Sequence, residues 1–414
     1  MLTWVRVQSD NADRYSEALR PFSRDEFGSG VEAPSEGHIE AANELLSVLR
    51  DDLARRVRDL RVLTRATVNE PSSRNMRRMA AHKERTHLAA RRVEQIWDFY
   101  FELFGQRQSR FGSWLVGCDR IALDCYQYAY LGIGTNRSVP APQAFCYMRT
   151  GFSPATFRRG IPMRRLGRRL NPFPLIQLPY HRLTNPWTLG AILHEVAHNL
   201  QNDLGLAAAI PDAVRARLLE AGIPPTVAAV WVRWNRESFA DMCGVLLGGP
   251  AVVASLYDVI ARSPATVVAY SRRGPHPTPY LRAYLSLELL HRLGFHQDER
   301  QLRAIWTRMY PTVRGGTIPV PILATFDRAH RIVVDAMCFT PFPSLGGRAV
   351  AQVLRFETKE QQMIEEAARR LATATDPGVV PERFLIGAAR FALDRRLASP
   401  DVVTTNFYRH LARR

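Results

Sequence analysis

The sequence contains almost no lysine, no closely spaced cysteine pair and no long apolar run. Of the 56 basic residues among 414, only Lys83 and Lys359 are lysines. The five cysteines are an odd number without a CxxC pattern, which argues against a disulfide scaffold and against a cysteine zinc knuckle. Because no stretch reaches about 18 uninterrupted apolar residues and no signal peptide is visible, we expect a soluble, cytoplasmic protein without a transmembrane segment.

Nearly all of the basic residues are arginines, and the formal net charge is +17. A strongly basic balance is typical of proteins that bind a polyanion such as a nucleic acid. A compositional bias that replaces lysine by arginine throughout the chain produces the same total. The arginines are dispersed and not confined to one recognisable module, so we favour the bias and keep nucleic-acid binding as the alternative.

The first part of the chain, residues 1–135, is predicted to be a helical N-terminal region. Residues 1–35 show no clear period and are expected to form a loosely packed arm. From Ser35 onward apolar residues recur at three- and four-residue steps, which indicates a helix. A second long helix over Arg74–Phe104 would complete a hairpin, and Trp114–Leu131 is a third helical candidate.

The middle of the chain, residues 136–310, differs from the first part because short strand patterns appear in it, and it is predicted to be the catalytic core. Ala144–Arg149 and Leu175–Leu178 read as short strands bounded by proline and glycine. Between them, residues 158–169 form an expected loop with six arginines. Residues 311–414 are predicted to be a helical C-terminal region, so the fold class is α+β, mostly α, with a small sheet.

One helical segment in the core carries an HExxH pattern at His194, Glu195 and His198. Asn185 can cap this helix, and Pro186 suits its first position. The two histidines are then one turn apart on one face, so both imidazoles can reach one metal ion. Glu195 stands next to the first ligand, where it can hold a metal-bound water.

Two histidines leave the zinc coordination shell incomplete, and a third protein ligand is required. The position at which an extended HExxHxxGxxH pattern needs histidine is Leu204. Glu237 is the best candidate, because Asp241 lies one turn after it and can accept the N–H of a ligating histidine. Taken alone, Glu237 and Asp241 would read as a solvated helix face. The HExxH pattern upstream favours the ligand interpretation.

HExxH followed by ExxxD resembles the gluzincin metallopeptidases, which belong to the zincins. Over residues 175–285 the closest motifs are those of the branch that includes CaaX-type and HtpX-type proteases, and a His-Pro…Arg element runs from His276 to Arg282. Those relatives are membrane proteins and this chain lacks their transmembrane helices, so their substrates are not carried over. The resemblance implies a zincin-like core that binds Zn²⁺ through three residues, His194, His198 and Glu237.

The resemblance also implies roles for the residues around the metal. Glu195 would be the general base, and Asp241 would orient His194. A transition-state donor besides zinc is needed, for which His276 is the first candidate and Tyr280 and Arg282 are the reserves. Zincins align an extended substrate on an edge strand, and Ala144–Arg149 is the expected one.

The sequence therefore predicts a zinc-dependent endopeptidase that cleaves a protein or peptide substrate through a zinc-activated water, with Glu195 as base. The alternative is a basic nucleic-acid- or polyanion-binding protein whose zinc site is structural or degenerate. In that case the arginines at 74–92 and 158–169 would contact the polyanion. No motif indicates the substrate or the oligomeric state.

Overall fold

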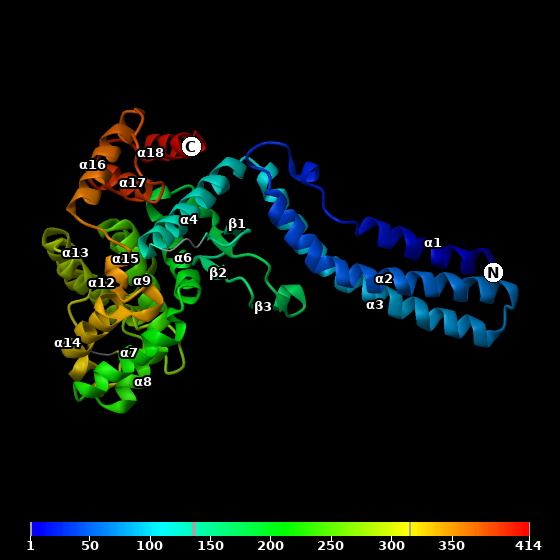
Figure 1. Cartoon of the computed structure of the whole chain (residues 1–414), viewed down its shortest axis with the longest axis horizontal. Coiled ribbons are helices and arrows are strands. Elements are labelled where there is room, and N and C mark those ends of the chain that lie inside the picture. Colours follow the sequence, from blue (N-terminus) through cyan, green and yellow to red (C-terminus); the bar gives the residue numbers. More distant parts are fainter. Residues whose placement is uncertain (1, 135–137, 314–315, 414) are drawn as a thin grey trace. The chain divides into compact units, whose positions relative to one another are not determined.

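The structure is a computed structural model, and it describes residues 2–134, 138–313 and 316–413. Helices dominate, and the strands are few and short (Figure 1). The predicted fold class, α+β and mostly α with a small sheet, is confirmed. Within the described residues no helix combines the length and the hydrophobicity that a membrane crossing requires.

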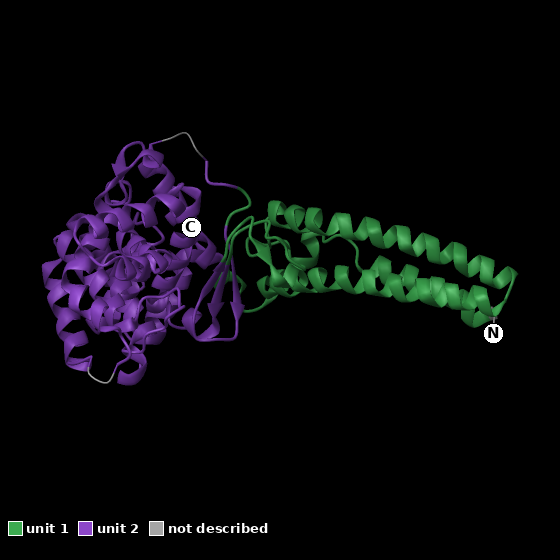
Figure 2. Cartoon of the chain, turned by 90° about the horizontal axis from the view of Figure 1, so that it is seen from below, with its two compact units in different colours: residues 1–115, 141–143, 157–175 green, residues 116–140, 144–156, 176–414 purple. Residues whose placement is uncertain are grey.

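The chain divides into two compact units (Figure 2). Unit 1 comprises residues 1–115, 141–143 and 157–175, and unit 2 comprises residues 116–140, 144–156 and 176–414. Unit 2 therefore draws on all three of the regions into which we divided the sequence, and unit 1 draws on the first two.

Three helices form most of unit 1: α1 (Leu2–Ala18), α2 (Glu36–Asn69) and α3 (Ser73–Gly105). The helix predicted to open at Ser35 is confirmed, since the Ser35 hydroxyl accepts a hydrogen bond from the backbone N–H of His38. The chain turns back after α2, and α3 packs against it as the second half of a hairpin. The two predicted long helices are thus present within one or two residues at the start of each.

Residues 1–35 do not form the loosely packed arm that we expected, because α1 lies in the first half of this segment. Its buried face is half polar and consists of Val5, Gln8, Ser9 and Ala12. The Gln8 amide oxygen accepts a hydrogen bond from Lys83 of α3 at 2.5 Å. A search for apolar periodicity does not detect a helix whose inward face carries amide and hydroxyl groups.

The arginine-rich segment 158–169 is more ordered than the loop that we predicted. Strands β3 (Pro162–Met163) and β4 (Arg169–Leu170) pair antiparallel within unit 1, with Pro162 opposite Leu170. The guanidinium of Arg165 lies 5.8 Å from the centre of the Phe99 ring. The segment is therefore a small hairpin, and part of it packs on α3.

A three-stranded sheet accompanies the helices of unit 2, with the strand order β1-β5-β2. β1 (Phe145–Arg149) and β5 (Leu175–Pro179) confirm the two predicted strands. β2 (Ala155–Phe157) was not predicted, because it is short and half-exposed throughout. β1 and β2 are the outer strands of this sheet among the described residues.

The remaining elements of the chain are mostly helices, and most belong to unit 2. The α-helices are α4 (Gly112–Ile133), α5 (Tyr180–Leu183), α6 (Gly190–Asp203), α7 (Leu206–Glu220), α8 (Pro225–Arg233), α9 (Asn235–Gly248), α10 (Pro250–Ile260), α11 (Pro264–Val267), α12 (Pro279–Arg292), α13 (His296–Met309), α14 (Val320–Val334), α15 (Val350–Val353), α16 (Thr358–Ala372), α17 (Phe384–Asp394) and α18 (Pro400–Ala412). The 3-10 turns are η1 (Arg24–Phe27), η2 (Gln106–Gln108), η3 (Arg164–Leu166), η4 (Pro186–Thr188) and η6 (Pro343–Leu345), with a π-helical turn η5 (Asp335–Phe339) and a strand pair β6 (Pro341–Phe342) and β7 (Arg348–Ala349). The segment predicted to be helix or strand, Trp114–Leu131, is therefore helix.

A buried ion pair joins α4 to the residue that precedes α17 in unit 2. The Arg383 guanidinium donates to both carboxylate oxygens of Asp124, at 2.9 and 3.0 Å, and its Nε donates to the Leu247 carbonyl. Only 5% of the Arg383 side chain is exposed. The guanidinium also lies 3.9 Å from the centre of the Tyr128 ring. Every side of this arginine is therefore occupied by the protein.

Candidate metal centre

The candidate site is built on two helices of unit 2, α6 and α9, which pack against each other. An apolar stripe that starts just before α6 and runs along it is fully buried and consists of Leu189, Ile192, Leu193, Val196 and Leu200. Burying that stripe fixes the rotation of α6, so that His194 and His198 come to the same side. HExxH therefore lies on a core helix.

The start of α6 differs from our prediction. Asn185 and Pro186 begin the 3-10 turn η4, and α6 itself begins at Gly190. The Asn185 side chain does not cap α6, because its amide donates to the His181 carbonyl at 2.6 Å. After the end of α6, Gly205 has a φ of +70°, where glycine is favoured.

Two glycines on α9 allow its backbone to come close to α6. A Cβ at Gly248 would stand 2.6 Å from Cδ2 of Leu193, which is closer than real Cβ atoms come to a neighbour. A Cβ at Gly244 would stand 3.7 Å from the backbone nitrogen of His194. Glu237 and Asp241 precede these glycines at helical spacing on the same face of α9. The close approach therefore brings both carboxylates to the HExxH helix.

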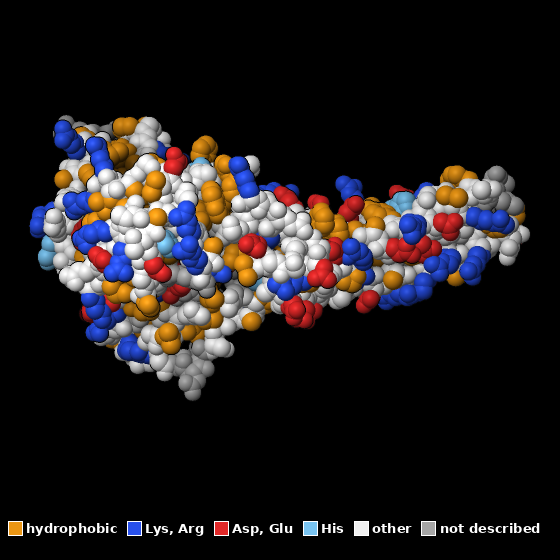
Figure 3. Space-filling model, turned by 90° about the horizontal axis from the view of Figure 1, so that it is seen from above, with side chains coloured by type: hydrophobic (Ala, Val, Ile, Leu, Met, Phe, Trp, Pro, Cys, Tyr) orange, Lys and Arg blue, Asp and Glu red, His pale blue; other side chains and the backbone are white. Residues whose placement is uncertain are grey.

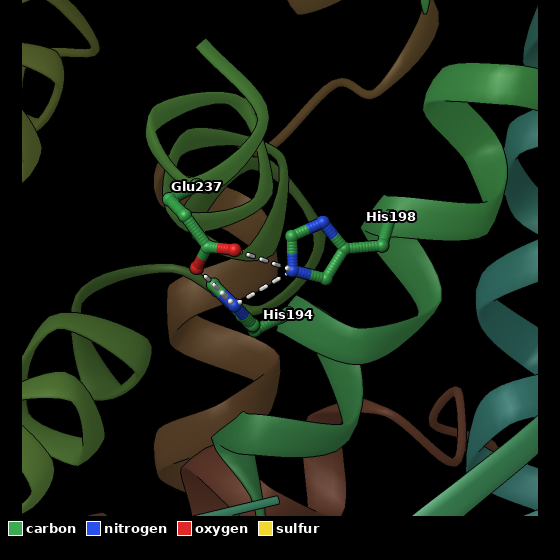
Figure 4. Close-up of side chains that lie close together, drawn as sticks. All are labelled: His194, His198 and Glu237. Carbon is green, nitrogen blue, oxygen red and sulfur yellow. Dashed lines mark hydrogen bonds and ion pairs between the residues drawn. The ribbon is translucent and has the colours of Figure 1, made fainter. Parts of the chain in front are cut away.

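The ligand atoms predicted for zinc converge on one point (Figure 4). Nε2 of His194 and Nε2 of His198 are 3.1 Å apart. The Glu237 carboxylate places one oxygen 3.5 Å from the first nitrogen and its other oxygen 3.5 Å from the second. Among the described residues this is the one group of three or more such side chains close enough to hold a metal ion.

The spacing of these atoms suits a small tetrahedral ion. Two ligand atoms that each lie about 2.05 Å from a tetrahedral zinc stand about 3.3 Å apart. The observed separations of 3.1, 3.5 and 3.5 Å bracket that value. Two imidazoles and one carboxylate are also a ligand set that zinc accepts, with a fourth position left for water or substrate. The residues present therefore fit Zn²⁺.

The orientation of His194 is held from behind by a buried chain of charges. Its Nδ1 lies 2.9 Å from Oδ1 of Asp241, so this nitrogen carries the proton that Asp241 accepts, and Nε2 faces the other ligands. Asp241 in turn accepts two hydrogen bonds from Arg282 of α12, at 2.5 and 2.7 Å. All three side chains are largely buried, which leaves His194 one ring orientation.

The charged groups of the cluster shift one another's pKa values. Burial lowers the pKa of His194, but its hydrogen bonds to Asp241 and Glu237 outweigh burial and raise that pKa to about 10. Burial and the neighbouring charge of His194 lower the pKa of His198 to about 3. Burial raises the pKa of Glu237, yet hydrogen bonds from His194 and His276 hold it far below its usual range. A charged carboxylate thus faces two ring nitrogens at the point where a cation would sit.

Glu195 is buried beside this cluster, with 6% of its surface exposed. Burial, together with the negative charge of Glu237, raises the pKa of Glu195 to about 7 against the opposing influence of His194. Its carboxyl also interacts electrostatically with Arg282 and His276. The group therefore lies in the same site as the predicted ligands and has a pKa suited to exchanging protons near neutrality.

The three candidate transition-state donors have different surroundings. His276, in the loop before α12, places Nε2 3.2 Å from Oε2 of Glu237, and 57% of its side chain is exposed. The Tyr280 ring lies beside that of Tyr284, one turn along α12, with ring centres 5.4 Å apart and planes tilted by 55°. Arg282 is buried and its guanidinium is bound to Asp241. Of the three, His276 combines contact with the cluster and access to solvent.

Sequence reasoning did not find the contact between α6 and the sheet. The Asn199 amide, directly after His198, donates to the Thr156 hydroxyl of β2 at 3.0 Å and to the Glu195 carbonyl at 3.1 Å. β2 is therefore the outer strand that is tied to the HExxH helix, whereas we expected Ala144–Arg149 to play this part. A single threonine in a three-residue strand gives no signal in the sequence.

The assignment of this site as a candidate metal centre rests on these residues alone. No protein-family model matches the chain, and no curated protein and no solved structure matches it either.

Proposed function

We propose that the chain is a gluzincin-type zinc endopeptidase that hydrolyses peptide bonds in a protein or peptide substrate. The observation that carries the proposal is the convergence of His194, His198 and Glu237 on one point, with Glu195 buried beside it. Three protein ligands leave a coordination position free for chemistry. A carboxyl next to the first ligand is the group that such a reaction requires.

Zn²⁺ held by the three ligands would supply a Lewis acid that lowers the pKa of a water molecule and polarises the scissile carbonyl. Glu195 accepts a proton from the attacking water and then donates it to the leaving amine. Its raised pKa, about 7, suits both halves of that transfer, because neither protonation state is strongly disfavoured near neutral pH. The leaving group thus departs as a neutral amine.

Other residues of the chain position these groups. Asp241 holds the Nδ1 proton of His194, and Arg282 keeps Asp241 charged and immobile, so we assign Arg282 to positioning and not to the substrate. His276 is the residue that we assign to the oxyanion, because it is exposed and its ring touches Glu237. Tyr280 remains the reserve.

We further propose that β2 aligns the extended substrate. β2 is an outer strand among the described residues, and an extended peptide can add to an outer strand through its backbone. The bond from Asn199 to Thr156 ties β2 to the helix that carries His198.

The alternative is a binding protein with a structural zinc site, and two features argue against it. A structural zinc has four protein ligands, whereas three converge among the described residues. A structural site also has no need of a buried carboxyl with a pKa near 7, such as that of Glu195.

Zinc content and peptidase activity, measured on the same samples, test the proposal. We expect about one zinc per wild-type chain, and little or none in Glu237→Ala. The matched control is Glu220→Ala, which removes an exposed carboxylate from α7 and should keep its zinc. Wild-type protein without zinc after reconstitution would refute the metal site. Zinc-loaded protein that cleaves no member of a diverse peptide library would refute the peptidase.

A further inference from the structure

A second feature that suggests a function is the uneven distribution of charge along the α2–α3 hairpin in unit 1. Residues 55–92, which include the turn between the helices, hold twelve basic and three acidic side chains. Residues 36–54 and 93–105, which form the other end, hold one basic and eight acidic side chains. The turn end therefore carries +9, more than half of the net charge of the chain, while the other end carries −7. A uniform arginine bias does not produce such a separation.

Most of the basic residues at the turn end have no partner within the protein. Eight arginines are exposed there and make no ion pair or side-chain hydrogen bond with any described residue: Arg58, Arg65, Arg74, Arg77, Arg78, Arg85, Arg91 and Arg92. Figure 3, which views the molecule from above, shows blue side chains on this part of unit 1 with red ones among them. Exposed guanidinium groups that the protein itself does not neutralise are available to an external anion.

Four of the eight fall on one line along α3. Arg74, Arg78, Arg85 and Arg92 are separated by four, seven and seven residues, so at 3.6 residues per turn they lie within about 40° of one another. At 1.5 Å per residue the line is about 27 Å long. We call these four residues the arginine stripe.

The neighbouring helix α1 does not cover the arginine stripe. α1 contacts α3 at three positions. Lys83 donates a hydrogen bond to Gln8, Glu94 accepts one from Tyr15, and the His87 ring lies edge-on to the Tyr15 ring. These three positions lie about 180° around α3 from the stripe. The acidic side chains of α1 are therefore on the wrong side of the helix to neutralise it.

We propose that the arginine stripe binds the phosphate backbone of a double-helical nucleic acid. A straight row of cations about 27 Å long matches about eight base pairs of a duplex, whose charge also repeats along a line. Arginine suits this partner better than lysine, because its planar guanidinium binds phosphate oxygens in pairs. The surface has no aromatic side chain on the line of the stripe, so it lacks the stacking platform that single strands use.

The same face is poorly suited to a lipid surface. A helix that lies on a membrane inserts a continuous apolar face beside its basic residues. The apolar face of α3, which includes Met79, Ala90 and Val93, is buried inside unit 1. One exposed leucine, Leu88, lies near the stripe, and a single side chain does not anchor a helix. The inference does not depend on the metal site, which belongs to unit 2.

Fluorescence anisotropy with the full-length protein and a 24-base-pair duplex of arbitrary sequence tests the proposal. Releasing counterions from four phosphates gives a slope of log K against log salt of about −3.5. In the triple variant Arg78→Glu, Arg85→Glu, Arg92→Glu we expect a slope near −1 and an affinity about 100-fold lower at low salt. Duplex DNA and duplex RNA should bind about equally, and a second sequence should bind as well as the first.

A charge-matched variant separates the stripe from the net charge of the chain. Arg300, Arg308 and Arg328 are exposed arginines of unit 2 that form no ion pair with a described residue, so Arg300→Glu, Arg308→Glu, Arg328→Glu is the control. We expect it to keep its affinity for the duplex within about threefold. Equal losses in both variants, no binding by wild type, or binding that disappears with a zinc chelator would overturn the proposal. So would stronger binding to phosphatidylserine vesicles, to an acidic protein or to a single strand.

Discussion

Arginine has opposite surroundings at two places in the molecule. In unit 2, Arg282 and Arg383 are buried, and each binds an aspartate through two hydrogen bonds. At the turn end of the α2–α3 hairpin of unit 1, eight arginines are exposed and unpaired among the described residues. The amino-acid composition does not distinguish the buried arginines from the exposed ones. The surroundings of each guanidinium decide whether it holds the fold and the metal site in place or faces an external partner.

This difference also bears on the two functions that the sequence suggested. The peptidase and the polyanion-binding protein were competing interpretations of one chain. The structure assigns their residues to different units, with the metal ligands in unit 2 and the arginine stripe in unit 1. The two proposals therefore do not exclude each other, and each can be broken separately.

The largest expected effect comes from the buried charge cluster of unit 2. Glu195→Gln removes the proton acceptor and keeps the shape of the side chain. We expect the rate constant for peptide cleavage to fall about 10³-fold, within the range attributed to general-base catalysis, while the zinc content stays unchanged. The check is kcat on a cleavable peptide alongside metal analysis. Activity equal to that of wild type would remove Glu195 from the mechanism.

The next effect compares a buried arginine pair with an exposed one. Asp124→Ala leaves the Arg383 guanidinium buried without its carboxylate, and we expect a loss of about 3–5 kcal/mol in the free energy of unfolding. The control Asp52→Ala breaks the exposed pairs with Arg55 and Arg56 and should cost about 0.5 kcal/mol or less. Urea unfolding measures both. Similar losses in the two variants would contradict the distinction between the units.

Unit 1 has its own buried titratable group, His38, which bonds to the Gln143 carbonyl and the Ser35 hydroxyl. Burial, aided by the charges of Arg107 and Arg159, lowers the pKa of His38 to about 4 against the opposing effect of the hydrogen bond to Gln143. The unfolded chain, with a pKa near 6.5, therefore takes up this proton more readily than the folded chain. Its contribution to stability is complete above about pH 6.5 and is lost as the pH falls toward 4.

Between pH 7 and pH 4.5 the expected loss from His38 is about 2–3 kcal/mol. His38→Gln keeps an N–H for the Gln143 carbonyl and removes the titration, so its unfolding free energy should fall less over the same interval. Urea unfolding at the two pH values gives the difference between the two proteins. A parallel decline in both would mean that other groups set the acid sensitivity.

The smallest expected effect concerns the positioning of His194. Asp241→Asn keeps an oxygen that can accept the Nδ1 proton but removes the charge that Arg282 binds. We expect the zinc affinity to fall about 10–100-fold. Competition with a chromogenic chelator measures it, with Asp212→Asn, an exposed change on α7, as the control. If the affinity does not change, the buried chain behind His194 serves stability alone.

The sequence predicted the elements whose signal is local and repeated. The apolar period after Ser35 predicted a helix, because burial of one face leaves a regular trace in the residue order. The spacing of HExxH and of Glu237 with Asp241 predicted which of these side chains share a helix face. α1 was missed because polar Gln8 and Ser9 fill its inward face.

Contacts between distant segments were out of reach for the same physical reason. The bond from Asn199 to Thr156 joins a helix to a three-residue strand, and neither residue type is unusual where it stands. The sequence makes Arg282 a reserve transition-state donor, because its place in the His-Pro…Arg element is visible, whereas its pairing with Asp241 is not. The number of arginines in the sequence does not identify the arginine stripe, because their exposure and their ion pairs are known only from the structure.

The two glycines of α9 have a consequence for which metals the protein accepts. Gly244 and Gly248 let α9 lie close to α6, and a methyl group at the second would stand 2.6 Å from Cδ2 of Leu193. The ligand atoms that these two helices carry lie 3.1–3.5 Å apart. A calcium ion, which needs six to eight oxygen atoms at about 2.3–2.6 Å, finds neither the room nor the donors here. The selectivity for the metal ion would therefore depend on the two glycines of α9 as well as on the three ligands.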